Sequence, residues 1–241
     1  HSVVIKGGQP LHFKTNNGKW EDISFIPSWL NNEKTTFGIE KSPSEITVNI
    51  ETGKVSMKVN NSEFTFSPNI ELRQIDSKGS ELKSQKAIID QFKVIDNKIL
   101  FVDIFPNIDL EITIMPFKVK SNYIVKKDLN FSNQTKTIAI TNQINQDKER
   151  LKVIGQSREA ETLKLLSSNS DTLFMSPILI YDKDTKNIDK HSTGFYNFSE
   201  KENLLIMKFD KTSVFNSNTQ YPVTIDPFVS NFSTASVSSC F

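Results

Sequence analysis

The chain has 241 residues, which suits one large all-β domain or two smaller ones. Lys and Arg number 29 against 28 Asp and Glu, and both signs are interspersed, so the basic stripe of a nucleic-acid-binding protein is excluded. The single cysteine, Cys240, excludes an internal disulfide framework and a multi-cysteine zinc site. No apolar run approaches the roughly 20 residues of a membrane span, so we expect a soluble chain.

The chain begins at His1 with neither Met nor an apolar targeting segment, and we expect a processed mature chain or a fragment. Its apolar residues favour strands, since Ile and 18 Phe dominate and side chains of this kind fit a pleated sheet. The opening predicts a hairpin from Val3–Ile5 through Leu11–Phe13 to Lys19–Ile23. Asn17-Gly18 supplies the positive φ angles of its turn.

A meander is predicted next. Ile46–Ile50, Val55–Val59 and Phe64–Phe66 alternate with a period of two, and turns at 51–54 and Asn60-Asn61 separate them. The same alternation predicts later strands at 87–95, 99–105, 110–115, 122–129, 136–144, 151–154, 178–181, 204–209 and 223–225. One helix is expected at Arg158–Leu166, where Ala160, Leu163 and Leu166 could share a face. The predicted fold is all-β, with short antiparallel strands forming one or two β-sandwich-like lobes.

Candidate catalytic histidines are few. A serine or cysteine nucleophile needs a nearby base, and only His1, His12 and His191 are available. His1 is terminal, His12 alternates with strand residues, and His191 lies in a polar turn. Ordinary surface or strand histidines are therefore the better interpretation, and no catalytic residue is predicted.

Two acidic clusters are candidates for a metal site, and the first also for a glycosidase pair. Asp109 and Glu111 share a strand face with Asp103 nearby, but Asp109 follows a turn, and a turn Asp commonly caps backbone amides. The run Asp182–Asp189 begins like a calcium loop, yet it lacks the glycine and glutamate such a loop requires. We therefore predict two turns, with no metal and no cofactor.

Phosphate loops are not indicated, because Gly7-Gly8 is followed by Gln9-Pro10 and no lysine-serine pair opens a helix there. A sugar-stacking platform would need exposed aromatic side chains, which on strands are more often core. The candidates are Trp20, Trp29, Tyr123, Tyr181, Tyr196 and Tyr221. An exposed groove holding at least two aromatics would favour a binding module, and its absence would favour a scaffold.

Several segments resemble a known pattern. Pro10–Phe13 with Asn17–Trp20 resembles the "dGkW" opening of large secreted bacterial proteins, and Phe101–Glu111 resembles their "vfpgiDle" segment, with Asn107 where glycine is usual. Tyr221–Pro227 matches their "YPvtIDP" terminator. The pattern is similar to the N-terminal region of very large surface proteins, including YD-repeat (Rhs-like) and adhesin-type proteins.

That resemblance implies a secreted or cell-surface, non-catalytic structural module that presents downstream adhesive, repeat or toxin regions; a carbohydrate- or protein-binding module is the alternative. We expect residues 1–227 to form the module, as one unit or as lobes 1–133 and 134–227, and residues 228–241 to form a linker or the next module. The implied partners are those downstream modules, the export machinery or another surface protein. Tyr221, Val223 and Ile225 are expected to form the last strand, which the chain leaves at Pro227.

Overall fold

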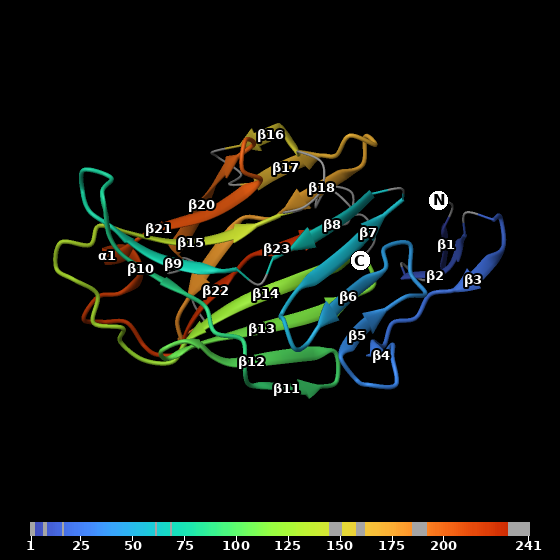
Figure 1. Ribbon diagram of the computed structural model, residues 1–241, viewed down its shortest axis with the longest axis horizontal. Coiled ribbons are helices and arrows are strands. Elements are labelled where there is room, and N and C mark those ends of the chain that lie inside the picture. Colours follow the sequence, from blue (N-terminus) through green and yellow to red (C-terminus); the bar gives the residue numbers. More distant parts are fainter. Residues whose placement is uncertain are drawn as a thin grey trace.

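The computed structural model describes residues 3–6, 9–15, 17–60, 62–67, 69–144, 151–157, 162–184 and 192–230. Its architecture is nearly all β, with antiparallel sheets, none of them closed, and one very short helix. Figure 1 shows the strands running obliquely along the molecule, with the N-terminal strands, which lie within residues 3–22, at one end of the long axis. The predicted fold class is confirmed.

The N-terminal strands form a separate three-stranded sheet at one end of the molecule, drawn in dark blue in Figure 1. Its strands are β1 (Val3–Lys6), β2 (Gln9–Lys14) and β3 (Trp20–Asp22). Gly18 has a φ of 83° in the turn between β2 and β3. A glycine adopts this left-handed conformation without steric cost, so the predicted hairpin is confirmed.

A five-stranded antiparallel meander follows, in the order β4-β5-β6-β7-β8. The strands are β4 (Ser28–Trp29), β5 (Thr36–Ile39), β6 (Ile46–Asn49), β7 (Val55–Val59) and β8 (Ser62–Phe66). In β7, Val55, Met57 and Val59 are buried while the intervening side chains are not. This period of two confirms the predicted meander.

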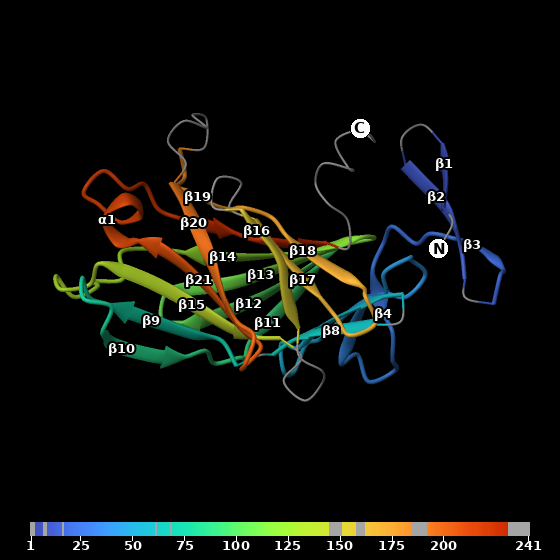
Figure 2. The ribbon, with the colours of Figure 1, turned by 90° about the horizontal axis from the view of Figure 1, so that it is seen from above.

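The remaining strands form a 15-stranded sheet that folds into two layers. The first layer runs in the order β10 (Glu81–Lys86), β9 (Glu71–Ile75), β15 (Thr137–Gln143), β21 (Leu204–Asp210) and β20 (Ser192–Ser199). The end of β20 pairs with β21, whereas its beginning pairs with β19 (Ile178–Tyr181) of the second layer. This one strand therefore joins the two layers, which Figure 2 shows from above.

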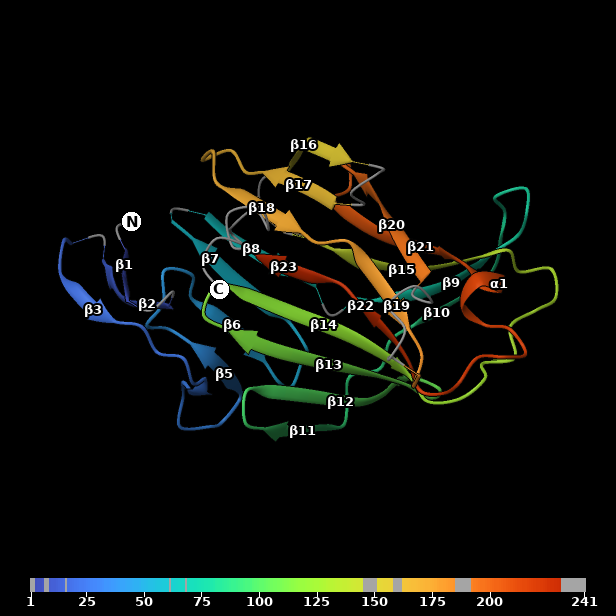
Figure 3. The same ribbon diagram turned by 180° about the vertical axis from the view of Figure 1, so that it is seen from behind.

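The second layer begins with the hairpins β11 (Phe92–Ile95), β12 (Lys98–Phe105), β13 (Ile108–Met115) and β14 (Lys118–Val125). Two short strands, β22 (Val223–Asp226) and β23 (Phe228–Ser230), then lie end to end along β14. Beyond them come β19, β18 (Thr172–Met175), β17 (Thr162–Leu166) and β16 (Lys152–Ser157). Figure 3 shows β22 and β23 in the middle of this layer.

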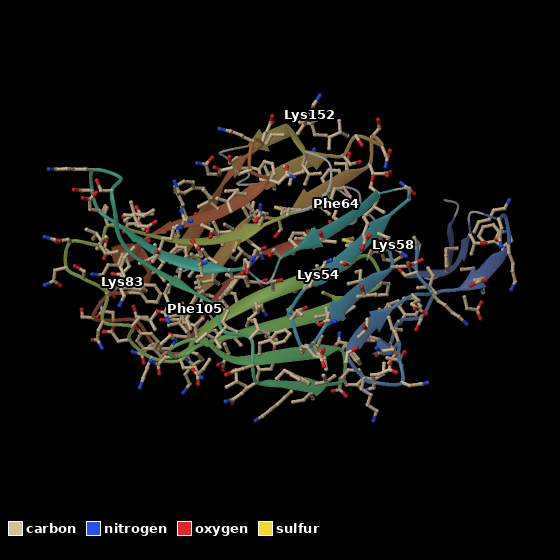
Figure 4. All side chains as sticks on the ribbon, in the orientation of Figure 1. Lys54, Lys58, Phe64, Lys83, Phe105 and Lys152 are labelled. Carbon is tan, nitrogen blue, oxygen red and sulfur yellow. The ribbon has the colours of Figure 1, made fainter. Side chains whose placement is uncertain are left out.

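One apolar core fills the space between the layers and continues under the meander. Ile99, Phe101, Ile138 and Leu163 have no exposed surface, and Phe64 of the meander belongs to the same cluster. In Figure 4 the labelled Phe64 and Phe105 lie among the interior side chains, and the labelled lysines are surface residues. Each buried apolar side chain contributes about 1.5–3 kcal/mol, so this shared core ties the sheets together.

The helix predicted at Arg158–Leu166 is wrong where the structure describes it, because residues 162–166 form β17. Leu163 and Leu165 are both fully buried, so the pattern has the period of a strand. The helix of the structure is α1 (Lys211–Val214), whose N-terminal amides are capped by Asp210. The predicted strand at 87–95 shortens to β11.

The chain does not leave the sheet at Pro227, contrary to our expectation. Pro227 only separates β22 from β23, and β23 continues the pairing with β14 while its other neighbour becomes β18. The sheet thus extends to residue 230, within the segment assigned to a linker. Strands from both sides of residue 133 also alternate in this sheet, since β9 and β21 flank β15 and β14 flanks β22.

Candidate functional site

Of the three histidines, the structure describes only His12, since His1 and His191 lie outside the described residues. His12 Nδ1 lies 2.6 Å from Asp22 Oδ1 on the neighbouring strand β3. The side chains are 44% and 87% exposed, so this is a surface contact across a hairpin. The pair stabilises little, because exposed charges are well solvated.

Asp103 and Asp109 form a turn-stabilising cluster with Lys126. Lys126 Nζ lies 2.8 Å from Oδ1 of each aspartate. Asp109 accepts a hydrogen bond from the Asp103 amide at 2.7 Å, and Asp103 accepts one from the Asn107 amide at 3.0 Å. The predicted capping role of Asp109 is confirmed.

Backbone geometry explains why caps are needed here. Asp103 and Asn107 have φ angles of 51° and 66°, and the β12–β13 register shifts between Phe101 and Phe105. Asp and Asn adopt this left-handed conformation more readily than other non-glycine residues. The hydrogen bond from Lys126 holds the pKa of Asp103 below its usual value, so the carboxylate stays charged at neutral pH.

Glu111 does not join this cluster. Its Oε2 pairs with Lys98 Nζ at 3.1 Å, and its Oε1 accepts a hydrogen bond from Asn122 Nδ2 at 3.2 Å. Each of the three acids is therefore oriented toward a lysine. Across the described ranges, no group of three or more His, Cys, Asp or Glu side chains could hold a metal ion.

Only the start of the second acidic run, Asp182 and Asp184, is described, and residues 185–191 are not. Asp182 Oδ1 accepts a hydrogen bond from the Asp184 amide, and Oδ2 accepts one from the Gln220 amide, each at 3.0 Å. Asp182 therefore joins the end of β19 to the segment that precedes β22.

Two of the six aromatic candidates belong to the core and two more, Trp29 and Tyr221, pack against it half-buried. Tyr123 and Tyr196 are almost completely buried, which raises the pKa of both hydroxyls well above the usual value. Trp29 packs edge-on against Phe37 at 5.2 Å between ring centroids. Trp20 is 47% exposed. Tyr123 and Tyr196 line a small cavity of about 50 Å³ in the interior, and of the six candidates only Tyr181 is among the described residues that line the surface groove beside α1.

A polar groove of about 480 Å³ lies beside α1, and we call it the end groove. Ile180, Val214 and Val223 lie along it, but their side chains belong to the buried core and leave almost no exposed surface in the groove. Tyr181 also lines the groove. The polar residues of the lining are Asp182, Asp184, Ser192, Ser213, Asn216, Asn218, Thr219 and Gln220. Figure 2 shows α1 and β19 on the same side of the molecule.

Hydrogen bonds hold the walls of the end groove in place. Thr219 Oγ1 donates to the Val214 carbonyl at 2.9 Å and accepts from the Asn216 amide at 2.9 Å. Ser192 Oγ donates to the Ser213 carbonyl at 3.0 Å. Sequence reasoning missed this groove, because β19, α1 and the loop that follows meet only in the fold. The polar run 216–220 indicated no more than a loop.

No model of a known protein family matches the chain, and no curated protein sequence matches it. The resemblance to YD-repeat and adhesin-type surface proteins therefore stays a prediction. In the part of the chain that the structure describes, no helix is long and apolar enough to cross a membrane.

Proposed function

We propose that this chain is a non-catalytic structural module of a secreted or cell-surface bacterial protein, which anchors and presents a polypeptide that follows it. The observation that supports this proposal most strongly is the place of the last two strands. β22 pairs with β14 on one side and β19 on the other, and β23 pairs with β14 and β18.

This arrangement suits a module that carries tension. A force applied along β22 and β23 would load the hydrogen bonds on both sides of each strand together. The inward side chains Val223 and Ile225 are each 1% exposed, so withdrawing β22 would also open the core. An edge strand such as β11, which pairs only with β12, could instead be peeled off a few bonds at a time.

The remaining features agree with a scaffold. The described acidic clusters are engaged by lysines and backbone amides, and the aromatic side chains chiefly fill the core. Downstream regions of the same polypeptide are the partners that this proposal requires. Export machinery or another surface protein would be further partners.

Single-molecule pulling tests the proposal. The chain is anchored through an N-terminal tag and pulled through the thiol of Cys240, the only cysteine in the sequence. The matched control carries Cys240→Ser and Lys93→Cys, which moves the handle to the edge strand β11. We expect a higher peak unfolding force through Cys240 than through position 93. A peak force through Cys240 that is equal or lower would refute the anchoring role.

A further inference from the structure

We propose that Asn17 is a self-modification site, which converts to aspartate and isoaspartate without an enzyme and thereby loosens the β2–β3 hairpin. Asn17-Gly18 is the only Asn-Gly pair in the sequence. Both residues are exposed at the tip of this hairpin. The inference goes beyond the structural role, because it concerns a covalent change in the N-terminal sheet and not the anchoring strands β22 and β23.

The reaction needs only water and groups that the turn itself contains. The backbone nitrogen of Gly18 attacks Cγ of Asn17, the new N–C bond closes a five-membered succinimide ring, and the side-chain nitrogen of Asn17 leaves as ammonia. Water then opens the ring at either carbonyl. One opening gives aspartate, and the other gives isoaspartate, in which the main chain runs through the former side-chain carbon.

The surroundings of Gly18 favour ring closure. Glycine is the least hindered residue that can follow the asparagine, because a Cβ on the attacking residue crowds the ring. A Cβ added at Gly18 would have only Lys14 Cε within 4 Å, at 3.8 Å. No packed neighbour among the described residues therefore holds this part of the turn in place.

The carbonyl group that is attacked is already polarised. The Lys19 amide donates a long hydrogen bond of 3.4 Å to Asn17 Oδ1, and the Thr15 hydroxyl lies against the same oxygen. Negative charge develops on this oxygen as the nitrogen attacks. A donor aimed at an oxygen of this kind lowers the barrier to the reaction.

One hydrogen bond must break before the nitrogen can attack. The Gly18 amide donates to the Thr15 carbonyl at 2.9 Å, which ties up the attacking nitrogen. The turn belongs to the separate three-stranded sheet at one end of the molecule (Figure 1), and loop tips of this kind open at low free energy. We therefore expect Asn17 to react in the folded chain, but more slowly than in the unfolded chain.

The two products differ in their effect on the hairpin. Aspartate keeps an acceptor oxygen in the place of Oδ1, so the hydrogen bond from Lys19 can persist. Isoaspartate adds one carbon to the main chain of a loop that is closed by the Thr15 amide, which donates to the Lys19 carbonyl at 2.8 Å. Loop length fixes the register of a hairpin, so the isoaspartate form should lose this bond and the neighbouring pairing of Lys14 with Trp20.

The test incubates the whole folded chain for several weeks in mildly alkaline buffer. Peptide mapping by mass spectrometry follows each asparagine, and chromatography separates aspartate from isoaspartate. Asn133 and Asn218 are exposed and are followed by Gln and Thr, so they are controls within the same molecule. A parallel sample in urea gives the rate in the unfolded chain, and Asn17→Gln keeps the amide group but disfavours the ring.

We expect Asn17 to convert at least about tenfold faster than Asn133 and Asn218 in the folded chain, and Asn17→Gln to stay unmodified. Absence of conversion at Asn17, or conversion no faster than at the two controls, would overturn the inference. A rate in urea that does not exceed the rate in the folded chain would refute the part assigned to the Gly18 hydrogen bond.

Hydrogen exchange tests the structural consequence. The Thr15 amide should be protected in the unmodified chain and in Asn17→Asp, and it should exchange freely in the isoaspartate form. Equal protection in all three would overturn the proposed loosening of the hairpin. None of these results bears on the pulling experiment, so the two proposals fail independently.

Discussion

Removing the last two strands should cost the molecule most of its stability. A shortened chain that ends at residue 220 lacks β22 and β23. It loses the buried side chains Val223 and Ile225, each 1% exposed and each contributing about 1.5–3 kcal/mol. Their loss alone amounts to about 3–6 kcal/mol, against a typical total of about 5–15 kcal/mol.

The indirect cost adds to this sum. β14 would lose the neighbours that it has along 118–120 and 123–125, and the buried Tyr123 would be uncovered. β18 would lose its pairing with β23, so the block β16-β17-β18 would no longer be hydrogen bonded to the rest of the layer. We therefore expect the chain ending at 220 to be unfolded or barely folded in buffer.

Two further shortened chains separate the contribution of β22 to stability from that of β23. A chain ending at 227 keeps β22 and loses β23, so an intermediate loss of about 1–3 kcal/mol is expected, because half-buried Val229 and the pairings of β23 with β14 and β18 disappear. A chain ending at 230 keeps every strand of the structure and should match the full chain. Urea unfolding followed by far-ultraviolet circular dichroism measures all four free energies.

A point substitution checks the same reasoning without shortening the chain. Ile225→Ala should cost about 2–5 kcal/mol, because it leaves a cavity in the core. Leu179→Ala, on the adjacent strand but 41% exposed, should cost well under 1 kcal/mol. Equal unfolding free energies for the chains ending at 220 and 230 would refute the central place given to β22.

Other predictions concern caps, charges and close packing. Asp210→Ala should cost about 1 kcal/mol in urea unfolding, because Asp210 caps α1 through the amides of residues 212 and 213, and Asp210→Asn should recover part of it. The ion pair with Lys136, together with these bonds, holds the pKa of Asp210 below its ordinary 3.8. The stabilisation that the charged Asp210 carboxylate gives the fold is therefore complete above about pH 4 and is lost as the pH falls further. The difference in unfolding free energy between wild type and Asp210→Ala should accordingly shrink in acid. Lys126→Met should cost about 1–3 kcal/mol, since it leaves the largely buried Asp109 carboxylate without its cation, and an unchanged urea midpoint would contradict the bridging role. Gly38→Ala should destabilise by about 3 kcal/mol or more in the same assay, since a Cβ there would lie 2.1 Å from the Ile46 carbonyl oxygen; a folded variant of normal stability would show that this approach is not tight.

Strands that bury one face could be predicted from the sequence. β7 follows from alternating apolar residues and β19 from a short apolar run, and Asp109 could be predicted as a cap from the turn before it. β10 could not be predicted, because most of its side chains, from Glu81 to Lys86, are exposed and its sequence does not alternate between apolar and polar residues. The sequence predicts a helix where β17 forms, because Ala160, Leu163 and Leu166 also fit a helical spacing.

The pairing of strands that are far apart in the chain could not be predicted from the sequence. Pro227 correctly predicted a break, yet β14 supplies a neighbour on both sides of it, so the break does not end the sheet. The end groove was hidden for the same reason, since Asp182 and Gln220 are joined by a hydrogen bond across the fold. Local residue patterns do not show which distant segments will lie next to each other in the fold.

Native-state hydrogen exchange tests the central claim most directly, namely that β22 and β23 are held firmly in the middle of the largest sheet. The amides of β22 and of Val229 should exchange only through global unfolding, with the full unfolding free energy of the protein. The amides of the edge strand β11 that face away from β12 should exchange much faster. If the β22 amides exchanged as fast as those of a loop, the last strands would be a loosely attached tail and the anchoring role would be contradicted.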